Sequence, residues 1–161
     1  RDGSVGVSIP LRPDGSLDEG CVKMLKEVGQ WIRVNGQGIY GSSAWRVLGE
    51  GKDGKLNVLP GGFIGGSQAN HIFYSTDFRF TVGKDKALYA WCMTVPKPGE
   101  TLKIVSLGTD STVEKKQVTS VELLGVEGDK IEWKQEADGL RIVYPESASL
   151  KTAVGFRIVC E

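Results

Sequence analysis

Histidine is almost absent from this sequence, and cysteine is rare. The 161 residues contain one histidine, His71, and three cysteines, Cys21, Cys92 and Cys160. The cysteines are widely spaced, and no CxxC pair or Cys/His cluster occurs. Because a structural zinc site needs four grouped nitrogen or sulfur ligands, we expect no metal site. A single histidine without an identified partner also gives no credible Ser/His/Asp triad.

Long apolar runs and an excess of charge are lacking as well. No apolar stretch approaches the roughly 20 residues that a membrane-spanning helix needs, and 20 basic residues balance 20 acidic ones. We therefore expect neither nucleic acid nor a membrane as a partner. The glycine-rich stretch 61–66 lacks the Lys-Ser/Thr pair of a phosphate loop. No cofactor is expected.

Glycine, by contrast, is abundant, and its 22 residues favour many tight turns and a mainly β body. A chain of this length is one ordinary domain, or a small domain with an appended piece, and can bury a core. Cys92 and Cys160 fall in apolar, strand-like runs. Buried free thiols are the simplest interpretation, and a Cys92–Cys160 disulfide stays open because sequence alone does not fix pairing.

The first residues predict one strand, a turn and one helix. The run 5–10 is short and apolar, and Pro13-Asp14-Gly15 has the composition of a turn. Asp18 is a suitable N-cap for a helix that extends to about Val34. A strand followed by a turn and a helix is half of a β/α barrel unit.

The predicted helix carries an apolar stripe at helical spacing, which we expect to be buried, formed by Cys21, Leu25, Val28 and Ile32. Asn35-Gly36 is expected to end the helix, because both residue types tolerate positive φ. Residues 46–70 are rich in glycine and polar residues and predict a long connection with at most one short strand.

From residue 71 onward the pattern changes to alternating apolar and polar residues, which is typical of half-buried strands. Asp138-Gly139 is a hairpin signal, as is Gly128-Asp129. Repeated short strands with turns at this spacing predict an antiparallel sandwich. The expected strands cover residues 78–82, 88–95, 102–107, 118–124, 131–134, 140–144 and 154–158.

The order of several motifs resembles one enzyme family. Residues 28–45 read VGQWIRVNGQGIYGSSAW and resemble the segment of family 29 α-L-fucosidases that joins the catalytic barrel to a C-terminal β-sandwich. Gly38 and Ala44 depart from the alanine and proline that are usual there. Six further motifs follow in the family's order: GEG at 49–51, FRFT at 78–81, ALYA at 87–90, SLG at 106–108, VELLG at 121–125 and GLRI at 139–142.

The resemblance implies a division of the chain. Residues 1–45 would be the last strand and helix of the catalytic (β/α) barrel, and residues 46–161 an antiparallel β-sandwich with a connecting loop. The sandwich would have seven to eight strands in a Greek-key-like order. The parent enzyme would hydrolyse terminal α-L-fucose from glycans with retention, using no metal or cofactor. Its partners would be fucosylated glycans and the missing barrel, and its location secreted, periplasmic or lysosomal.

No catalytic residue is expected in this chain. A retaining glycosidase needs two carboxyl groups about 5–5.5 Å apart, and the family takes both from parts of the barrel that precede Arg1. Asp14 is interpreted as a turn residue and Glu50 as a solvated loop carboxylate. The chain alone is therefore expected to be an inactive accessory portion.

One residue is a candidate for sugar binding. Trp45 is expected in the loop between barrel and sandwich, where an aromatic ring can stack on a sugar or pack an interface. Trp31 and Tyr40 are expected at an interface or in the core, and Trp91 and Trp133 in the core. The alternative function is a carbohydrate-binding or purely structural module, because the sandwich fold serves many purposes. A lone exposed aromatic is weak support for that alternative.

Overall fold

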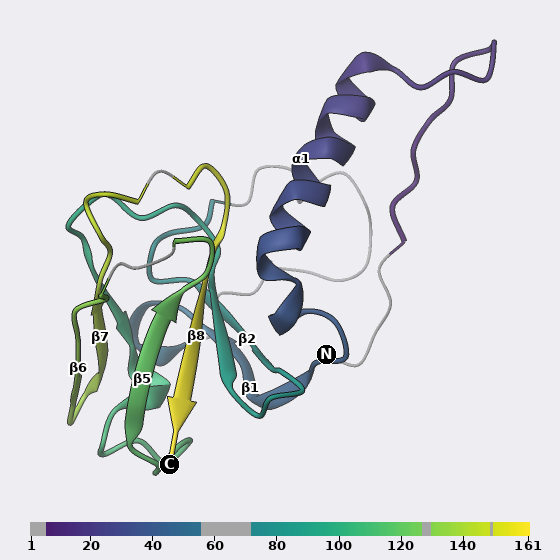
Figure 1. Cartoon of the computed structure of the whole chain (residues 1–161). Coiled ribbons are helices and arrows are strands. Elements are labelled where there is room, and N and C mark those ends of the chain that lie inside the picture. Colours follow the sequence, from purple (N-terminus) through teal and green to yellow (C-terminus); the bar gives the residue numbers. More distant parts are fainter. Residues whose placement is uncertain (1–5, 56–71, 127–129, 149) are drawn as a thin grey trace.

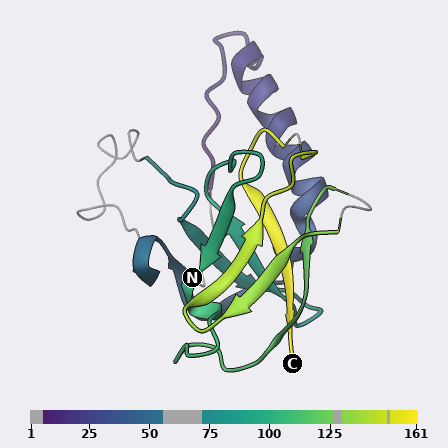
Figure 2. The same ribbon diagram turned by 90° about the vertical axis from the view of Figure 1, so that its left-hand side faces the viewer.

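A computed structural model describes residues 6–55, 72–126, 130–148 and 150–161. Within these ranges the chain forms two antiparallel sheets packed face to face and one long helix, α1 (Figure 1). Figure 2 views the molecule from the side of the smaller sheet, which lies in front of the larger one. The mainly β, antiparallel sandwich expected from the alternating pattern is confirmed.

Eight strands make up the two sheets in the described ranges. The larger sheet has the order β1-β2-β3-β8-β5, and the smaller one the order β4-β7-β6. The chain crosses repeatedly between the sheets, because β4, β6 and β7 belong to the smaller sheet while β5 and β8 return to the larger one. The bounds are β1 Ser43–Glu50, β2 Phe78–Val82, β3 Leu88–Cys92, β4 Thr101–Ile104, β5 Val118–Leu123, β6 Trp133–Glu136, β7 Gly139–Val143 and β8 Val154–Cys160.

The main core lies between the two sheets and follows the period of two along each strand. Phe80 pairs with Ala90, and Ala90 with Phe156, so one inward row crosses three strands. The facing row of the small sheet includes Leu102, paired with Ile142. All five side chains are at most 4% exposed. This inward alternation explains why the sequence pattern predicts β2 to β8, with ends that differ by up to three residues, while β1 is not among the predicted strands.

Helix α1 spans Glu19–Asn35, close to the predicted range. Asp18 caps it as expected, since its Oδ1 accepts a hydrogen bond from the Gly20 N–H at 2.8 Å. The expected positive φ at the helix end is wrong, because Gly36 has φ −58°. The chain continues instead into a short 3₁₀ helix, η1 (Gly36–Gly38). These glycines provide room: a Cβ at Gly38 would lie 2.6 Å from Trp91 Cζ2.

The segment before α1 is less regular than the sequence suggested. No strand forms at residues 6–10 in the described part of the chain, where the only regular pairing is an isolated bridge between Leu11 and Leu17. An extended segment needs a neighbour to pair with, and none is present there. The expected turn is confirmed: Gly15 has φ +83°, and its N–H bonds to the Arg12 carbonyl at 2.9 Å.

The connection after α1 also differs from the prediction. Residues 43–50 form β1, and a 3₁₀ turn, η2 (Lys52–Gly54), follows. Most of the expected loop 46–70, including the glycine-rich stretch 61–66, lies outside the described residues. The same is true of His71 and of the hairpin signal Gly128-Asp129.

The three cysteines are free, so the disulfide that the sequence left open does not form in the structure. Cys92 is fully buried on β3, and its Sγ lies 3.6 Å from the Ser75 carbonyl oxygen. Burial raises the thiol pKa of Cys92 and of Cys160 to about 11 each. Both thiols are therefore protonated and unreactive at neutral pH, while Cys21 on α1 is only partly covered.

Glu50 corrects one prediction outright, because it is a buried structural carboxylate and not a solvated loop residue. Its side chain is 0% exposed at the end of β1. The two carboxylate oxygens accept hydrogen bonds from the N–H groups of Val105 at 2.5 Å and Ser106 at 2.9 Å. These groups open the 3₁₀ helix η3 (Val105–Leu107), which follows β4. Glu50 thereby fastens the large sheet to the small one.

Burial raises the pKa of Glu50 above its ordinary value of 4.5, although hydrogen bonds from Ser106 and Val105 oppose the shift. A raised acid pKa means that the folded state holds the proton more tightly than the unfolded state. This contribution to stability is present at low pH. It is lost as the pH rises from about 4.5 through the folded pKa.

We predict that Glu50→Gln lowers the free energy of unfolding at pH 7 by about 1–3 kcal/mol, because the amide NH₂ cannot accept from a buried backbone N–H. The gap between wild type and variant should be larger at pH 5 than at pH 7, since only the wild type gains stability on protonation. Urea unfolding at both pH values measures it. If the difference in unfolding free energy between wild type and variant were the same at both pH values, the pKa of Glu50 would not be raised in the folded state.

Candidate functional site

Helix α1 presents an apolar face that nothing in the described structure covers. Of its 17 residues only Asn35 is buried. Leu25 is 41% exposed and Val28 48%, and Met24 and Val34 are exposed as well. The predicted burial of Cys21, Leu25, Val28 and Ile32 is therefore wrong for this chain. Leu25 and Val28 face solvent, and the other two side chains are half-buried. We call the exposed apolar residues 24, 25 and 28 the bare face of α1.

The reason is the position of the helix. Figure 1 shows α1 meeting the sandwich only near its C-terminal end, with its first turns projecting away from the strands. An apolar stripe at helical spacing normally faces a core. A stripe left in water over several turns is an exposed apolar patch, which in soluble proteins marks an interaction surface. The bare face is accordingly the main candidate site for contact with another body.

The C-terminal end of α1 is anchored firmly. Trp31 donates its indole N–H to the Ala153 carbonyl oxygen at 2.6 Å. Its ring lies 5.5 Å from the ring of Trp91, measured between centroids, at an angle of 54°. One turn later the Asn35 side-chain amide donates to the Trp31 carbonyl at 2.9 Å, a further bond within the last turn of the helix.

The surface under this anchor is the outer face of the large sheet. Tyr89 and Trp91 stack there with centroids 6.0 Å apart, and both are buried. Thr81 joins this face to the turn after α1, because its Oγ1 accepts from the Trp91 indole N–H and donates to the Gly38 carbonyl. The large sheet is therefore covered on both faces, by the small sheet on one side and by the helix end on the other. Trp31 at an interface and Trp91 in the core match the predictions.

Charged groups reinforce the same outer face beside Tyr89. The Arg157 Nε donates to Asp85 Oδ2 at 2.8 Å, and the Tyr89 hydroxyl donates to the same oxygen at 3.1 Å. Burial alone would raise the pKa of Asp85, but the hydrogen bonds from Arg157, Ala87 and Tyr89 outweigh it and lower the pKa. This group is a structural network, and nothing in its geometry leaves a free base or acid.

The two carboxylates considered in the sequence do not form a catalytic pair. Asp14 is exposed, and its Oδ1 accepts from the backbone N–H and hydroxyl of Ser16, which lowers its pKa. Glu50 is committed to the two backbone N–H groups of η3. Each carboxylate thus has a local structural role, in the turn and between the sheets.

Trp45, the predicted sugar platform, lies on β1 and not in a loop. Its ring makes an edge-to-face contact with Phe80, with centroids 4.9 Å apart at 67°, and the side chain is half-buried against the main core. Trp133 is likewise half-buried against that core, from the opposite edge of the sandwich. Tyr40 is 64% exposed, so the described residues do not give it the expected place at an interface or in the core. A role of Trp45 in sugar binding stays a prediction.

The described residues contain no group of three or more His, Cys, Asp or Glu side chains placed to hold a metal ion. None of their helices is both long and apolar enough to cross a membrane.

Comparisons with known proteins agree with this arrangement. Residues 68–159 match the family model of the alpha-L-fucosidase C-terminal domain. The chain is 26% identical over 145 residues to tissue alpha-L-fucosidase of Rattus norvegicus and 28% identical over 145 residues to that of Homo sapiens. Each alignment covers 89% of this chain, but 25% and 24% of the relatives. The chain thus spans about a quarter of the length of these relatives.

The fold has a counterpart among solved structures. The Thermotoga maritima alpha-fucosidase structure superposes with a TM-score of 0.60 at 21% identity, covering 94% of this chain and 29% of the other. At 21% identity this likeness concerns the fold alone. It agrees with the antiparallel β-sandwich that the sequence predicts and that the structure of this chain contains. Because the family model matches more than half of its residues, this chain belongs to the family of alpha-L-fucosidase C-terminal domains.

Proposed function

We propose that this chain is the accessory C-terminal portion of a retaining α-L-fucosidase that releases terminal α-L-fucose from glycans. In this proposal α1 and the residues before it complete the catalytic barrel, and the sandwich supports that barrel from outside. The observation that carries it is the bare face of α1. A helix with one buried residue in 17 and exposed Leu25 and Val28 needs a second apolar surface.

The rest of the chain has features that suit a support and not a catalyst. The end of α1 is held on the large sheet by Trp31, so whatever packs on the helix is fixed relative to the sandwich. The carboxylates considered for catalysis are engaged in local structure. The partner of the bare face is then the catalytic barrel of the same polypeptide. Fucosylated glycans would bind to that barrel, whose own carboxyl groups would cleave them.

We predict that the chain alone has no fucosidase activity, because the two carboxyl groups of a retaining mechanism belong to the barrel. An aryl α-L-fucoside, assayed beside the full-length parent at equal concentration, measures this. Turnover within an order of magnitude of the parent would overturn the accessory role.

Leu25→Ala tests the bare face in two settings. In this chain we expect a loss of unfolding free energy of about 0.5 kcal/mol or less, because the side chain is exposed and surface changes cost little. In the full-length parent the loss should be about 2–5 kcal/mol, the cost of truncating a buried leucine. Trp31→Ala is the control, since its contacts lie within this chain and its cost should appear in both. An equal, small cost of Leu25→Ala in both proteins would show that nothing packs on the face.

Free fucose should bind this chain no more tightly than about 1 mM, because one sugar ring on one aromatic offsets little of the cost of association. The half-buried Trp45 leaves only part of its ring for such a contact. Backbone amide shifts recorded during a fucose titration measure the affinity. Saturable shifts with a micromolar constant that disappear in Trp45→Ala would contradict this expectation and make Trp45 a binding residue.

A further inference from the structure

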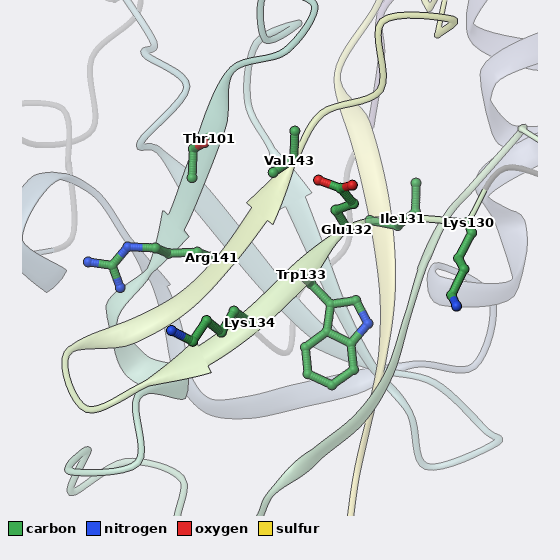
Figure 3. A pocket seen from close by; sticks show the side chains of 8 residues that line it. All are labelled: Thr101, Lys130, Ile131, Glu132, Trp133, Lys134, Arg141 and Val143. Carbon is green, nitrogen blue, oxygen red and sulfur yellow. The ribbon is translucent and has the colours of Figure 1, made fainter.

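A shallow groove follows the open edge of the sandwich where β6 and β5 approach each other. It has a volume of about 600 Å³ and is lined by residues of β5, among them Thr119 and Val121, together with Lys130 and Trp133. A second hollow, of about 740 Å³, shares Lys130 and Trp133 but lies over the outer face of the small sheet, where Thr101, Arg141 and Val143 line it (Figure 3).

Trp133 is the aromatic wall of this groove. One side of its ring packs on the main core, and the side chain remains partly exposed. Within the described residues, the structure gives its indole N–H no acceptor. Trp31 and Trp91, by comparison, donate theirs to Ala153 and Thr81. Since buried indole N–H groups normally find partners, an unpaired one at a groove is available to a ligand.

Two charged side chains beside the ring are also unpaired. Lys130 and Glu132 are exposed, and in the described part of the chain neither forms an ion pair or a side-chain hydrogen bond. Their neighbours on the small sheet behave differently: Lys134 pairs with Glu136 at 2.8 Å, and Lys103 with Asp138 at 2.6 Å. In Figure 3 the Trp133 ring and the Lys130 side chain extend to one side of the segment, and the Glu132 carboxylate extends to the other.

We propose that this groove binds an oligosaccharide chain, with the Trp133 ring stacked on the CH face of one sugar. Hydroxyl groups accept as well as donate hydrogen bonds, so they match the two donors on that side of the segment, the indole N–H and the Lys130 ammonium. An indole ring with one N–H group suits a sugar, because a sugar has apolar CH groups on one face and hydroxyl groups around its rim. This binding site is a function in addition to the proposed support of the barrel. It rests on that proposed function only because the latter suggests fucosylated oligosaccharides as probes.

A peptide strand added to the edge of β5 is the competing occupant, and the structure disfavours it. The Val118 N–H at the start of this edge is already bonded to Gln135 Oε1 at 2.9 Å. Gln135 also donates to the Leu107 carbonyl at 2.9 Å, so its amide fills the seam between the sheets. Strand addition needs a row of free edge groups, and here one end of that row is closed.

The test is a titration of this chain with a neutral fucosylated pentasaccharide, the same oligosaccharide without its fucose, and an extended octapeptide, recorded as backbone amide shifts. Both oligosaccharides should produce saturable shifts at residues 130–134, with dissociation constants on the order of 1 mM or below. Both should bind because the groove holds the chain and not the terminal sugar.

Variants separate the groove from general effects. Trp133→Ala should weaken binding at least about tenfold, the equivalent of about 1.4 kcal/mol. Because that change also touches the core, Lys130→Met serves as a surface variant that leaves the packing intact, and it should weaken binding several-fold. Glu132→Gln, whose side chain extends to the other side of the segment, should bind as the wild type does. Lys103→Met is the matched control, on the same sheet but outside the groove, and should bind as the wild type does.

Several results would overturn the site. One is the absence of saturable shifts with either oligosaccharide. A second is binding that survives both groove variants, Trp133→Ala and Lys130→Met, and a third is saturation by the octapeptide alone. The inactivity of this chain toward an aryl fucoside does not depend on the groove, so the two proposals fail separately.

Discussion

The close approach of the turn after α1 to the outer face of the large sheet determines the rest of the structure. It is possible only because side chains are missing at two points. A Cβ at Gly38 would overlap the rings of Tyr89 and Trp91, and one at Gly155 would lie 2.5 Å from Trp91 Cζ3. With these two positions bare, Trp31 reaches the Trp91 ring and the Ala153 carbonyl. The direction of α1 follows from this contact.

That direction has a functional consequence. The helix leaves the sheet at its C-terminal end, so its earlier turns pack on no surface formed by the described residues, and Leu25 and Val28 are exposed there. On the other face of the same sheet, Glu50 holds η3 and with it the small sheet. The large sheet is thus held by contacts on both faces, from the end of α1 on one side and from η3 on the other, and α1 projects from it. A sheet held in this way suits a domain whose role is to fix a neighbour in place.

How much of this was predictable depended on whether the signal was local. The alternation of Phe78 and Phe80 with Arg79 located β2, and the spacing of apolar residues with Asp18 as cap located α1. Those signals come from periodicity and capping, which act over a few residues. The strand at residues 6–10 failed because an extended segment also needs a neighbour, which the local sequence does not supply.

The site residues were harder to predict, since their roles depend on distant partners. Glu50 stands between two glycines, which resembles a turn, and its acceptor role depends on N–H groups 55 and 56 residues away. Trp133 alternates with charged residues, which predicts a core position, and the structure buries it only in part. Its position at the groove depends on the approach of the β5 and β6 edges, which a local pattern does not contain. The segment around Trp45 has no clear helical or strand period and so predicts a loop, although its residues pair in β1.

The central claim is that the bare face of α1 belongs against a second body, and amide hydrogen exchange tests it most directly. Exchange would be compared between this chain and the full-length parent, residue by residue along α1. Our account predicts fast exchange over the first turns of α1 in this chain, slow exchange near Trp31 in both proteins, and strong protection of the whole helix in the parent. Protection reports the free energy of local opening, which packing on the bare face would raise. Equal exchange of the first turns in both proteins would contradict the claim.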